Sequence, residues 1–407
     1  MPDQPPRTTV VVVTWRGRDL IGACLDALAA QTVPHGVLVV DNASTDGTAA
    51  VLAGRPVCAA RPVRVVRLRR NAGYAGALAA VLPGVDTPYV AWLNDDAVPE
   101  PGWLAALESI LDGHLDVAAA GSVLLDGGGA VQSAGVRLTP LGEGADVTTP
   151  GEVANVPASG AGTDRTAPED GTNLTAPGEE TGLPALSEKP GLSAPGEVFG
   201  FCGGAALLRT GALWAVGGVP AGFFCYYEDT DTSWRLRLAG HRIVTAPGAR
   251  VRHRHGASSE PGSERFHRWN ERNRLLMLLR CAPAGIALRE LARFAALTAF
   301  LPMRRLAAHR RHSADALVRR RQGTDGPTRC WQGADAPAHR WHGTDAPARR
   351  GVPDAANFRV RLRLRVLAEV TMRLPAAMVA RFRIGRLAAV SRTQLWRRWA
   401  RAADKAS

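Results

Sequence analysis

The chain has 407 residues, which is enough for one large domain with appendages or for two domains, and its hydrophobic content of 46% supports a sizeable core. Its formal charge is +13, but only Lys189 and Lys405 among its 50 basic residues are lysines. This bias toward Arg is typical of a GC-rich coding sequence, so part of the positive charge reflects the composition of the gene rather than a function such as binding an acidic partner. Its six cysteines form no CxxC pair, and it carries neither a signal-peptide pattern nor about 18 consecutive uncharged apolar residues, so we expect a cytosolic protein with reduced thiols and no spanning helix.

Short β-branched runs alternate with helical segments over residues 9–136. We expect, in order, strand 8–14, helix 20–30, strand 37–40, helix 48–52, strand 63–68, helix 74–81 and strand 89–93. This alternation predicts a parallel sheet covered on both faces, and ligands of such sheets bind outside the carboxyl ends of the strands. Polar clusters fall at these ends, at 41–47, 71–76 and 94–96, and mark the predicted site.

Two of these clusters are turns between a strand and a helix. Asp41 begins the first, and its carboxylate is suited to contact the base or ribose of a nucleotide, although Asx and Ser side chains at such a junction also cap helices. The second contains Asn71 and Gly73, and its glycines let the backbone approach a ligand closely. No GxGxxG or GxxxxGKS loop is present, so neither dinucleotide oxidoreduction nor P-loop chemistry is supported.

The third cluster, Asn94-Asp95-Asp96, is the most informative feature of the sequence. A strand that ends in adjacent carboxylates is destabilised unless a cation lies there. Mg²⁺ is often held by one or two carboxylates together with the phosphates of a substrate. The triplet therefore predicts a metal–diphosphate site, and a solvated acidic turn is the alternative.

A second acidic cluster follows an aromatic run that starts near residue 223. Glu228, Asp229 and Asp231 lie within four residues, and their mutual repulsion raises a proton affinity, which suits a general base. The alternative is a helix start whose acidic side chains are stabilised by the helix dipole. Farther along, His253 and His255 are two positions apart, and one of them is a candidate metal ligand or diphosphate contact, with a structural histidine as the alternative.

Two segments have compositions that do not suit a core. Residues 141–197 are rich in Gly, Pro, Thr and Glu and repeat phrases of the kind TAPGEE, so we expect a disordered surface insertion. Residues 311–353 contain a ten-residue repeat with Pro and Gly in its copies, which predicts a linker rather than a solenoid.

The last part of the chain is basic. Residues 281–310 predict an amphipathic helical extension whose apolar face consists of Leu288, Leu291, Phe294, Thr298 and Leu301. In the basic amphipathic tail, 354–407, residues 358–366 alternate as in a strand and residues 378–399 are helical in composition. Such a tail is suited to an anionic membrane, to nucleic acid or to solvent; we favour peripheral membrane contact and expect no nucleic acid. We expect its removal to leave the catalytic domain folded.

The ordered set of motifs resembles family 2 of the inverting glycosyltransferases and, within it, the bacterial rhamnosyltransferase-like branch. The motifs are VVVVTWRGRDLIGACLDALAAQT (10–32), VVDNASTDGT (39–48), NAGYAG (71–76), LNDDA (93–97), GGAALLRT (203–210), FFCYYEDTDTSWRLRLAGHRI (223–243) and a VxHxxGxS phrase (251–258). The resemblance covers residues 8–140 and 198–280. It implies a catalytic domain over 1–280 with a GT-A-type, Rossmann-like α/β fold, in which helices cover both faces of a mostly parallel sheet and C-terminal helices follow.

The resemblance also implies roles for single residues. Asp229 matches the catalytic base, with Glu228 beside it. Asp96 matches the last acid of the DxD-type motif and, with His253, would bind the metal. The implied nucleotide-sugar contacts are Thr14, Asp41, Asn71, Gly73, Asn94 and Asp95.

The implied activity is transfer of a sugar, with rhamnose favoured on analogy, from a nucleotide-diphosphate donor to a glycan or lipid-linked acceptor in cell-wall or surface polysaccharide synthesis, with Mg²⁺ or Mn²⁺. The enzyme would act in the cytoplasm at the inner face of the cell membrane. RFHRW (265–269) lacks the Gln of the QxxRW motif, which argues against a processive synthase, whereas Arg272-Asn273 matches a phrase that often follows in this family. The alternatives are a metal-dependent nucleotidyltransferase on a similar fold and a non-catalytic membrane-associated binder.

Overall fold

The structure, a computed structural model, describes residues 5–55, 57–58, 61–149, 154–155, 195–254, 262–321 and 359–400. His255, the ten-residue repeat and most of the predicted insertion lie outside these residues. The described ends of that insertion belong to the fold, because β11 (Gly144–Asp146) pairs with β10 (Val136–Leu138) and β13 (Gly196–Glu197) joins the main sheet. The insertion predicted to start at 141 therefore starts too early.

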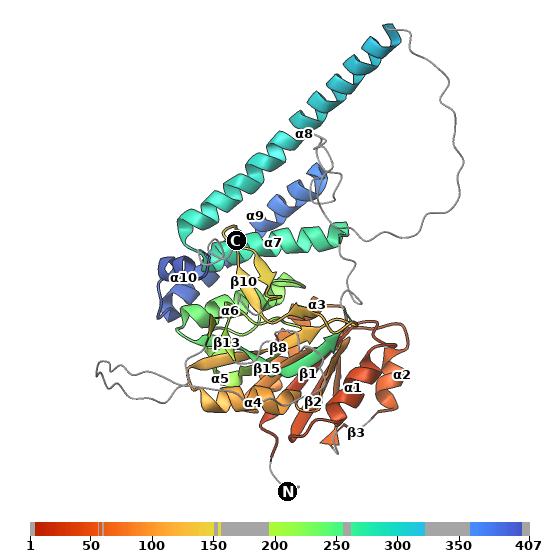
Figure 1. Cartoon of the computed structure of the whole chain (residues 1–407), viewed down its shortest axis with the longest axis vertical. Coiled ribbons are helices and arrows are strands. Elements are labelled where there is room, and N and C mark those ends of the chain that lie inside the picture. Colours follow the sequence, from red (N-terminus) through yellow and green to blue (C-terminus); the bar gives the residue numbers. More distant parts are fainter. Residues whose placement is uncertain are drawn as a thin grey trace, which may run out of the picture.

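A mixed, mostly parallel sheet forms the centre of the molecule (Figure 1). Its main path runs β12-β13-β15-β8-β14-β6-β1-β2-β5, with β7 paired to β15 and β9 to β8. β1, β2, β5 and β6 are parallel, as are β8 and β15, whereas β14 is antiparallel between β6 and β8. The further strand bounds are β1 Thr8–Thr14, β2 His35–Asp41, β3 Val57–Cys58, β4 Arg61–Pro62, β5 Arg64–Arg67, β6 Tyr89–Asn94, β7 Ala97–Pro99, β8 Val117–Leu125, β9 Val131–Ser133, β12 Ala154–Asn155, β14 Ala205–Arg209 and β15 Arg242–His253. The expected α/β fold is confirmed.

Helices cover both faces of the sheet because its central strands are buried on both sides. Val11 and Val13 of β1 belong to one hydrophobic core, and Val10 and Val12 belong to the other. Such a continuous apolar run is typical of a buried parallel strand. The helices are α1 Ile21–Ala29, α2 Thr48–Ala53, α3 Gly73–Val81, η1 Leu82–Gly84, α4 Trp103–Gly113, α5 Thr210–Ala215, η3 Ala221–Phe223, α6 Glu228–Leu238, α7 Glu264–Cys281, α8 Ala284–Arg321, α9 Val360–Leu387 and α10 Arg392–Trp399.

The C-terminal helices complete one of the two cores. Leu362, Val366 and Val370 of α9 repeat every four residues and are at most 6% exposed. The strand predicted at 358–366 was therefore wrong, because burial of this stripe against α7 and α8 favours the helical period over the alternation. In α10, Trp396 stacks on Trp234 with ring centroids 6.0 Å apart. A tail that supplies core residues does not fit the expectation that the domain stays folded without it.

The long helix α8 extends away from the other described elements (Figure 1) and continues past the helical extension predicted to end at 310. Leu288 is 62% exposed, contrary to its predicted place on the buried face. Glu290 is buried instead, and its carboxylate lies 3.5 Å from Arg274 and 2.9 Å from Arg293. Of the remaining residues of the predicted face, Phe294, Thr298 and Leu301 are at most 3% exposed, and the ion pairs of Glu290 lie on the same helix.

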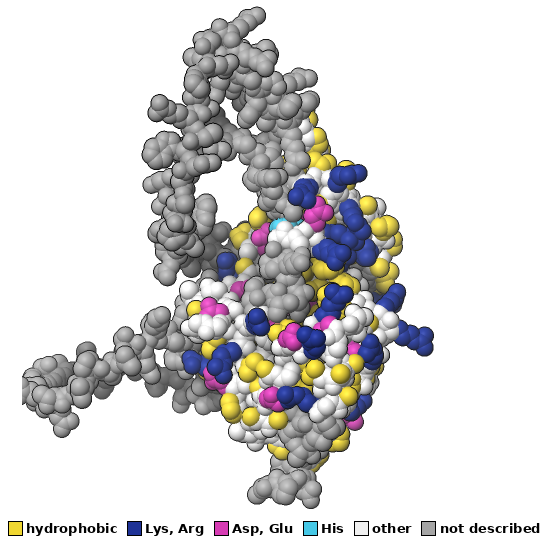
Figure 2. Space-filling model, turned by 90° about the vertical axis from the view of Figure 1, so that its right-hand side faces the viewer, with side chains coloured by type: hydrophobic (Ala, Val, Ile, Leu, Met, Phe, Trp, Pro, Cys, Tyr) yellow, Lys and Arg dark blue, Asp and Glu magenta, His cyan; other side chains and the backbone are white. Residues whose placement is uncertain are grey.

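Charged side chains are spread unevenly over the surface. On the face in Figure 2, arginines gather in a group near the upper end of the described surface and mix with Asp and Glu farther down. No helix within the described ranges combines the length and the apolarity that crossing a membrane requires.

Candidate active site

Three neighbouring strands end at one edge of the sheet and bring polar side chains together there. In the strand register Thr14 lies opposite Asp41, and Val13 lies opposite Asn94. Because β1, β2 and β6 run in the same direction, the clusters that follow them meet at their carboxyl ends. This edge is the one that the sequence predicted.

Asp41 is buried at the end of β2 and is 1% exposed. Its Oδ1 accepts a hydrogen bond from Ser44 N at 2.8 Å, whereas Oδ2 makes no hydrogen bond and lies 3.3 Å from a guanidinium nitrogen of Arg67. Arg67 also donates to Ser44 O at 2.8 Å, and about half of its side chain is exposed. A buried carboxylate with one uncommitted oxygen beside an accessible guanidinium is suited to accept a hydrogen bond from a sugar hydroxyl or a base N–H.

Asn71 and Gly73 form the adjoining turn before α3. Asn71 Oδ1 accepts hydrogen bonds from Gly73 N at 2.8 Å and from Asn42 Nδ2 at 3.0 Å, and Asn42 Oδ1 accepts one from Ala72 N at 2.8 Å. Gly73 has a φ of +74°, and a Cβ there would lie 2.1 Å from Phe224 O. Glycine is therefore required at this position, where the turn meets the loop that carries the second acidic cluster.

Asp95 is buried beneath the end of β1. Thr14 Oγ1 donates a hydrogen bond to Asp95 Oδ2 at 2.6 Å. Burial raises the pKa of Asp95 to about 7. Gly17 closes over this pair, because a Cβ there would lie 2.2 Å from Thr14 Oγ1 and 2.3 Å from Asp95 Oδ2. Asp95 thus supports Thr14 from within the protein, and a direct contact with a nucleotide sugar stays a prediction.

Asp96 and His253 face each other at the end of β6. Asp96 Oδ1 is buried without a hydrogen bond and lies 3.2 Å from His253 Nε2, and Asn94 Nδ2 lies 3.3 Å from the same nitrogen. Gln132 Oε1 lies 3.0 Å from His253 Nδ1, and Gln132 Nε2 donates to His253 O at 3.2 Å. Because Gln132 Oε1 can only accept, the proton belongs on Nδ1 and the lone pair of Nε2 is directed toward Asp96 and Asn94.

This arrangement fits a divalent cation. A carboxylate oxygen without a hydrogen bond and an imidazole lone pair converge, and both are suitable ligands. Within the described residues, no three His, Cys, Asp or Glu side chains are grouped so that they could hold a metal. Asp96 and His253 would therefore leave coordination positions to water and to the phosphates of a ligand, which is how Mg²⁺ is commonly bound.

The backbone holds these two side chains in place. β15 and β7 pair His253 with Ala97, and Arg254 N donates a hydrogen bond to Asp96 O at 3.1 Å. His253 therefore reaches the end of β6 although it lies more than 150 positions away in sequence.

The second acidic cluster follows a loop with an unusual backbone. Phe224, Tyr226 and Tyr227 have φ values of 68°, 70° and 68°, in the left-handed region that residues other than glycine avoid. Such a loop persists only if its surroundings hold it. It ends at Glu228, the first residue of α6.

Glu228 and Asp229 have different environments. Glu228 Oε2 is buried without a hydrogen bond, and burial together with the charge of Asp229 raises the pKa of Glu228 to about 8. Asp229 Oδ2 accepts a hydrogen bond from Gly203 N at 2.9 Å, and Oδ1 accepts one from Thr230 N at 2.5 Å. Burial also raises the pKa of Asp229, but these two donors favour its ionised form. Hydrogen-bond donors therefore hold the carboxylate of Asp229 in place, whereas Oε2 of Glu228 has no such donor.

Asp231 does not share this site. Its carboxylate is fully buried and lies 2.8 Å from Arg235 and 3.2 Å from Arg280. The two guanidiniums compensate the charge of Asp231. The repulsion that the sequence predicted among three carboxylates is therefore left between two of them, Glu228 and Asp229.

Asn273 of α7 holds the left-handed loop. Its Nδ2 donates to the carbonyl oxygens of Phe223, Cys225 and Tyr226 at 2.9, 2.8 and 2.8 Å. Arg272 also donates to Phe223 O, at 2.6 Å, and lies 3.2 Å from Glu369 of α9. The Arg272-Asn273 phrase thus positions the backbone that leads into the acidic pair, and α9 supports it.

Gly203 and Gly204 lie between the two polar centres. A Cβ on Gly203 would lie 3.2 Å from Asp229 Oδ2, and a Cβ on Gly204 would lie 3.6 Å from Asn94 Nδ2. Gly204 O accepts a hydrogen bond from Asn94 N at 2.9 Å. Because neither glycine has a side chain, the acidic pair and the end of β6 face each other across bare backbone.

The sequence did not indicate several residues that support the site. Asn42 and Gly17 belong to predicted motifs, but their contacts depend on strands that only the fold brings together. Arg67 ends β5 without a distinguishing pattern, and Gln132 lies in β9 outside every motif. No local signal marks Gln132, because its partner His253 comes from a different strand.

Comparison with known proteins agrees with this geometry. Residues 9–217 match the model of a family described as glycosyl transferase family 2, which is just over half of the chain. No curated protein matches the sequence.

Several solved structures are similar to the chain at low identity. GalNAc-T7 with UDP, GalNAc and Mn²⁺ has 13% identity and a TM-score of 0.49 over 67% of this chain, which spans 47% of the length of that protein. The mannosyltransferase PcManGT from Pyrobaculum calidifontis, with GDP-Man and Mn²⁺, has 20% identity and a TM-score of 0.45 over 72% of this chain and 76% of its own. TarS 1-349 from S. aureus, with UDP, has 16% identity and a TM-score of 0.42 over 70% and 68%. These TM-scores are below 0.5, so the family assignment rests on the sequence match.

Proposed function

Because the chain belongs to glycosyl transferase family 2, we propose that it is a metal-dependent enzyme that transfers a sugar from a nucleotide-diphosphate donor to an acceptor hydroxyl, with inversion at the anomeric carbon. One observation carries the proposal: Gly203 and Gly204 separate a buried acidic pair from a second centre that can hold a cation. Transfer with inversion needs these two functions, a base for the acceptor hydroxyl and positive charge for the leaving diphosphate.

We assign the donor to the carboxyl edge of β1, β2 and β6. The proposed nucleotide-sugar contacts are Thr14, Asp41, Asn71, Gly73, Asn94 and Asp95. The uncommitted Oδ2 of Asp41 would accept a hydrogen bond from the nucleoside, with Arg67 beside it. From there the diphosphate would extend along the strand ends toward Asp96.

Asp96 and His253 would hold Mg²⁺ or Mn²⁺. When bound, the ion supplies positive charge for the diphosphate that leaves. Gln132 fixes the tautomer and the orientation of the imidazole, and the buried position of Asp96 keeps its carboxylate directed toward the same point.

Asp229 is the proposed base. Gly203 N and Thr230 N orient its carboxylate and favour its ionised form, while burial raises its pKa and so strengthens it as a proton acceptor. Asp229 would take the proton of the acceptor hydroxyl as the new glycosidic bond forms, and the electron pair of the broken bond would leave with the diphosphate. Glu228, protonated at neutral pH, spares the site a second negative charge.

The resemblance of the motifs extends the proposal to substrates and place. We propose rhamnose as the sugar and a glycan or lipid-linked acceptor of cell-wall or surface polysaccharide synthesis, used at the inner, cytoplasmic face of the cell membrane. The exposed apolar and basic surface of α9 supports the membrane contact.

The test is product analysis with UDP-, GDP- and dTDP-sugars in the presence of Mn²⁺ or Mg²⁺. We expect release of a nucleoside diphosphate and an inverted anomeric product. Asp229→Asn should abolish transfer while calorimetry still detects donor binding, and Asp86→Asn, at an exposed acid away from the site, is the matched control. Turnover retained in Asp229→Asn would remove this residue as the base.

The same assays separate the alternatives. Release of pyrophosphate would indicate a nucleotidyltransferase. Donor binding that is indifferent to chelation of divalent metal, without turnover of any donor, would indicate a non-catalytic binder.

A further inference from the structure

From Met372 to its C-terminal end, α9 presents large apolar side chains to solvent. Met372, Val379 and Phe382 are 69%, 53% and 68% exposed, and Met378 and Leu387 are 38% and 53% exposed. The opposite side of the same helix is buried along its length, from Leu362 to Ile384, so α9 packs on the core with one face and offers apolar side chains to solvent on another. A group of exposed apolar side chains of this size marks a contact surface.

The charge around this surface has one sign. Residues 370–400 contain seven arginines and no Asp or Glu. The last acid before them, Glu369, is engaged by Arg268 and Arg272 and, within residues 370–400, pairs with Arg373 at 3.9 Å. Arg383 and Arg386 are exposed and form no ion pair with any described residue. An apolar helix face flanked by unpaired arginines matches the anionic surface of a bilayer.

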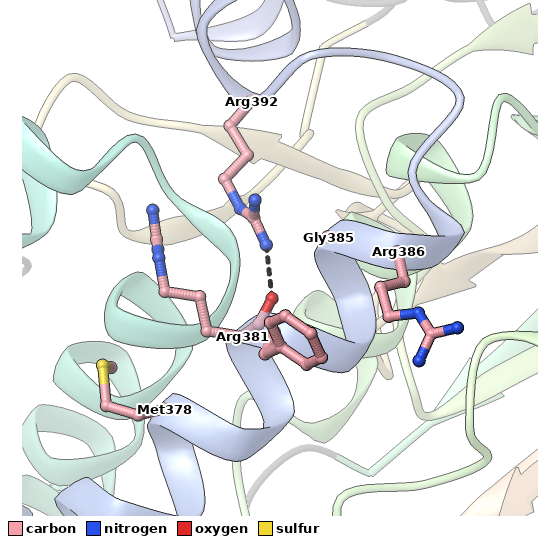
Figure 3. Close-up of a pocket in the computed structure, with 6 residues that line it drawn as sticks. Met378, Arg381, Gly385, Arg386 and Arg392 are labelled. Atoms are coloured by element: carbon pink, nitrogen blue, oxygen red, sulfur yellow. Dashed lines mark hydrogen bonds between the residues drawn. The ribbon is translucent and has the colours of Figure 1, made fainter.

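A hollow lies where α9 turns into α10. Its volume is about 490 Å³, and it is lined by Met378, Arg381, Phe382, Gly385, Arg386 and Arg392 (Figure 3). Arg392 reaches across Gly385, where a Cβ would lie 3.3 Å from its guanidinium, and donates to Arg381 O at 2.8 Å. Its Nε is buried and makes no hydrogen bond.

The three arginines around this hollow differ in how far the protein engages them. Arg381 donates to Leu279 O at 2.9 Å and to Ala282 O at 2.8 Å, at the end of α7, and is therefore committed to packing. Arg386 is exposed, and in Figure 3 its guanidinium projects away from Arg381. Arg392 lines the hollow with its guanidinium, although its Nε is buried and its Nη2 donates to Arg381 O. The guanidiniums of Arg386 and Arg392 can pair with a phosphate group. The exposed side chains of Phe382 and Met378 beside them can cover an apolar chain attached to that phosphate.

We propose that this docking face, made of Met372, Met378, Val379, Phe382, Arg386 and Arg392, binds the surface of an anionic phospholipid bilayer. A headgroup phosphate occupies the hollow, and the apolar side chains lie at the acyl boundary. This inference rests on the proposed function for its biological setting and specifies which face of the protein makes the proposed membrane contact. Binding to the bilayer itself does not require that the enzyme turn over a substrate. A second copy of the chain is the weaker candidate, because a two-fold interface would place arginines opposite arginines.

The full-length protein is tested by sedimentation with vesicles of phosphatidylcholine containing phosphatidylglycerol and with vesicles of phosphatidylcholine alone. We expect binding to the anionic vesicles only. Phe382→Ser/Arg386→Glu should weaken this binding by roughly 100-fold, because it removes one inserted ring and reverses one charge. Leu115→Ser/Arg64→Glu makes the same changes at an exposed leucine and an exposed arginine elsewhere and should bind as the unchanged protein does.

Three results would overturn the proposal: no binding of the unchanged protein to anionic vesicles, equal binding of the two double variants, or displacement from vesicles by millimolar inorganic phosphate alone. Self-association in sedimentation velocity that only Phe382→Ser/Arg386→Glu abolishes, without vesicle binding, would assign the face to a second copy instead. Both double variants should turn over a water-soluble acceptor as the unchanged protein does. Failure of all three proteins in that assay would count against the proposed function and leave the vesicle result intact.

Discussion

Replacing Asn273 with Ala tests whether one side chain holds the loop before the acidic pair. Phe224, Tyr226 and Tyr227 have left-handed backbones, at a cost of about 1 kcal/mol or more each, hence about 3 kcal/mol in total. Asn273 is fully buried, and its Nδ2 serves three loop carbonyls. At about 1 kcal/mol net per hydrogen bond, this one amide offsets most of that strain.

Without the amide, the strained and relaxed forms of the loop become close in free energy. We therefore expect Asn273→Ala to lower the free energy of local opening by about 3 kcal/mol, which corresponds to roughly 100-fold faster hydrogen exchange within the loop. The reporters are the amides of Cys225, which bonds Phe223 O, of Asp231, which bonds Tyr227 O, and of Ala75, which bonds Phe224 O. Because the loop leads into the acidic pair, kcat should fall far more than donor affinity.

Asn270→Ala is the matched control. Asn270 lies one turn earlier in α7, and its side-chain amide donates only within its own helix, to Phe266 O at 2.9 Å. This variant should leave exchange in the loop unchanged. Equal protection of the three reporter amides in Asn273→Ala and in the unchanged protein would refute the reasoning, as would uniform acceleration across the sheet, which would signify global destabilisation.

Three further predictions follow from the site. Burial raises the pKa of Glu228 from its ordinary value of 4.5 to about 8. The stability linked to its protonated form is therefore fully present below pH 4.5 and is lost as the pH rises through 8. Denaturant titrations should show the unchanged protein losing about 2–4 kcal/mol in free energy of unfolding, relative to Glu228→Gln, between pH 4.5 and pH 8.5. Gly73→Ala places a Cβ 2.1 Å from Phe224 O at a positive φ and should cost about 2 kcal/mol or more in free energy of unfolding, whereas Gly84→Ala, where nothing lies within 4 Å, should change it little. Gln132→Leu removes the acceptor that orients the His253 ring and should weaken Mn²⁺ binding about 10-fold to 100-fold in calorimetry without changing the fold; unchanged affinity would show that Gln132 does not set the tautomer.

The strand ends were predictable from the sequence because their pattern is local. A buried run such as 8–14 and the polar residues after it carry both the period of a strand and the position of its carboxyl end. Asp41, Asn94 and Asp96 are therefore predictable as candidate site residues, and the strand register places Asp41 and Asn94 along one edge.

The rest depends on contacts between distant elements. The alternation at 358–366 has the period of a strand, but Leu362 and Val366 form a helical stripe once α7 and α8 offer a surface to bury it. Leu288 has an apolar side chain, yet Glu290 takes the buried position because arginines of two helices converge on it. The support that Gln132 gives to His253 likewise arises from the pairing of separate strands.

The stacking of Trp396 on Trp234 also bears on how the chain is made. Trp234 leaves the ribosome long before α10 has been synthesised, so during translation this part of the nascent chain lacks its aromatic cover. The same holds for Phe199, which meets Trp399 with ring centroids 6.0 Å apart. Folding of this core must therefore wait until α10 has emerged, and a chain that stops before α10 leaves the rings of Trp234 and Phe199 without this cover.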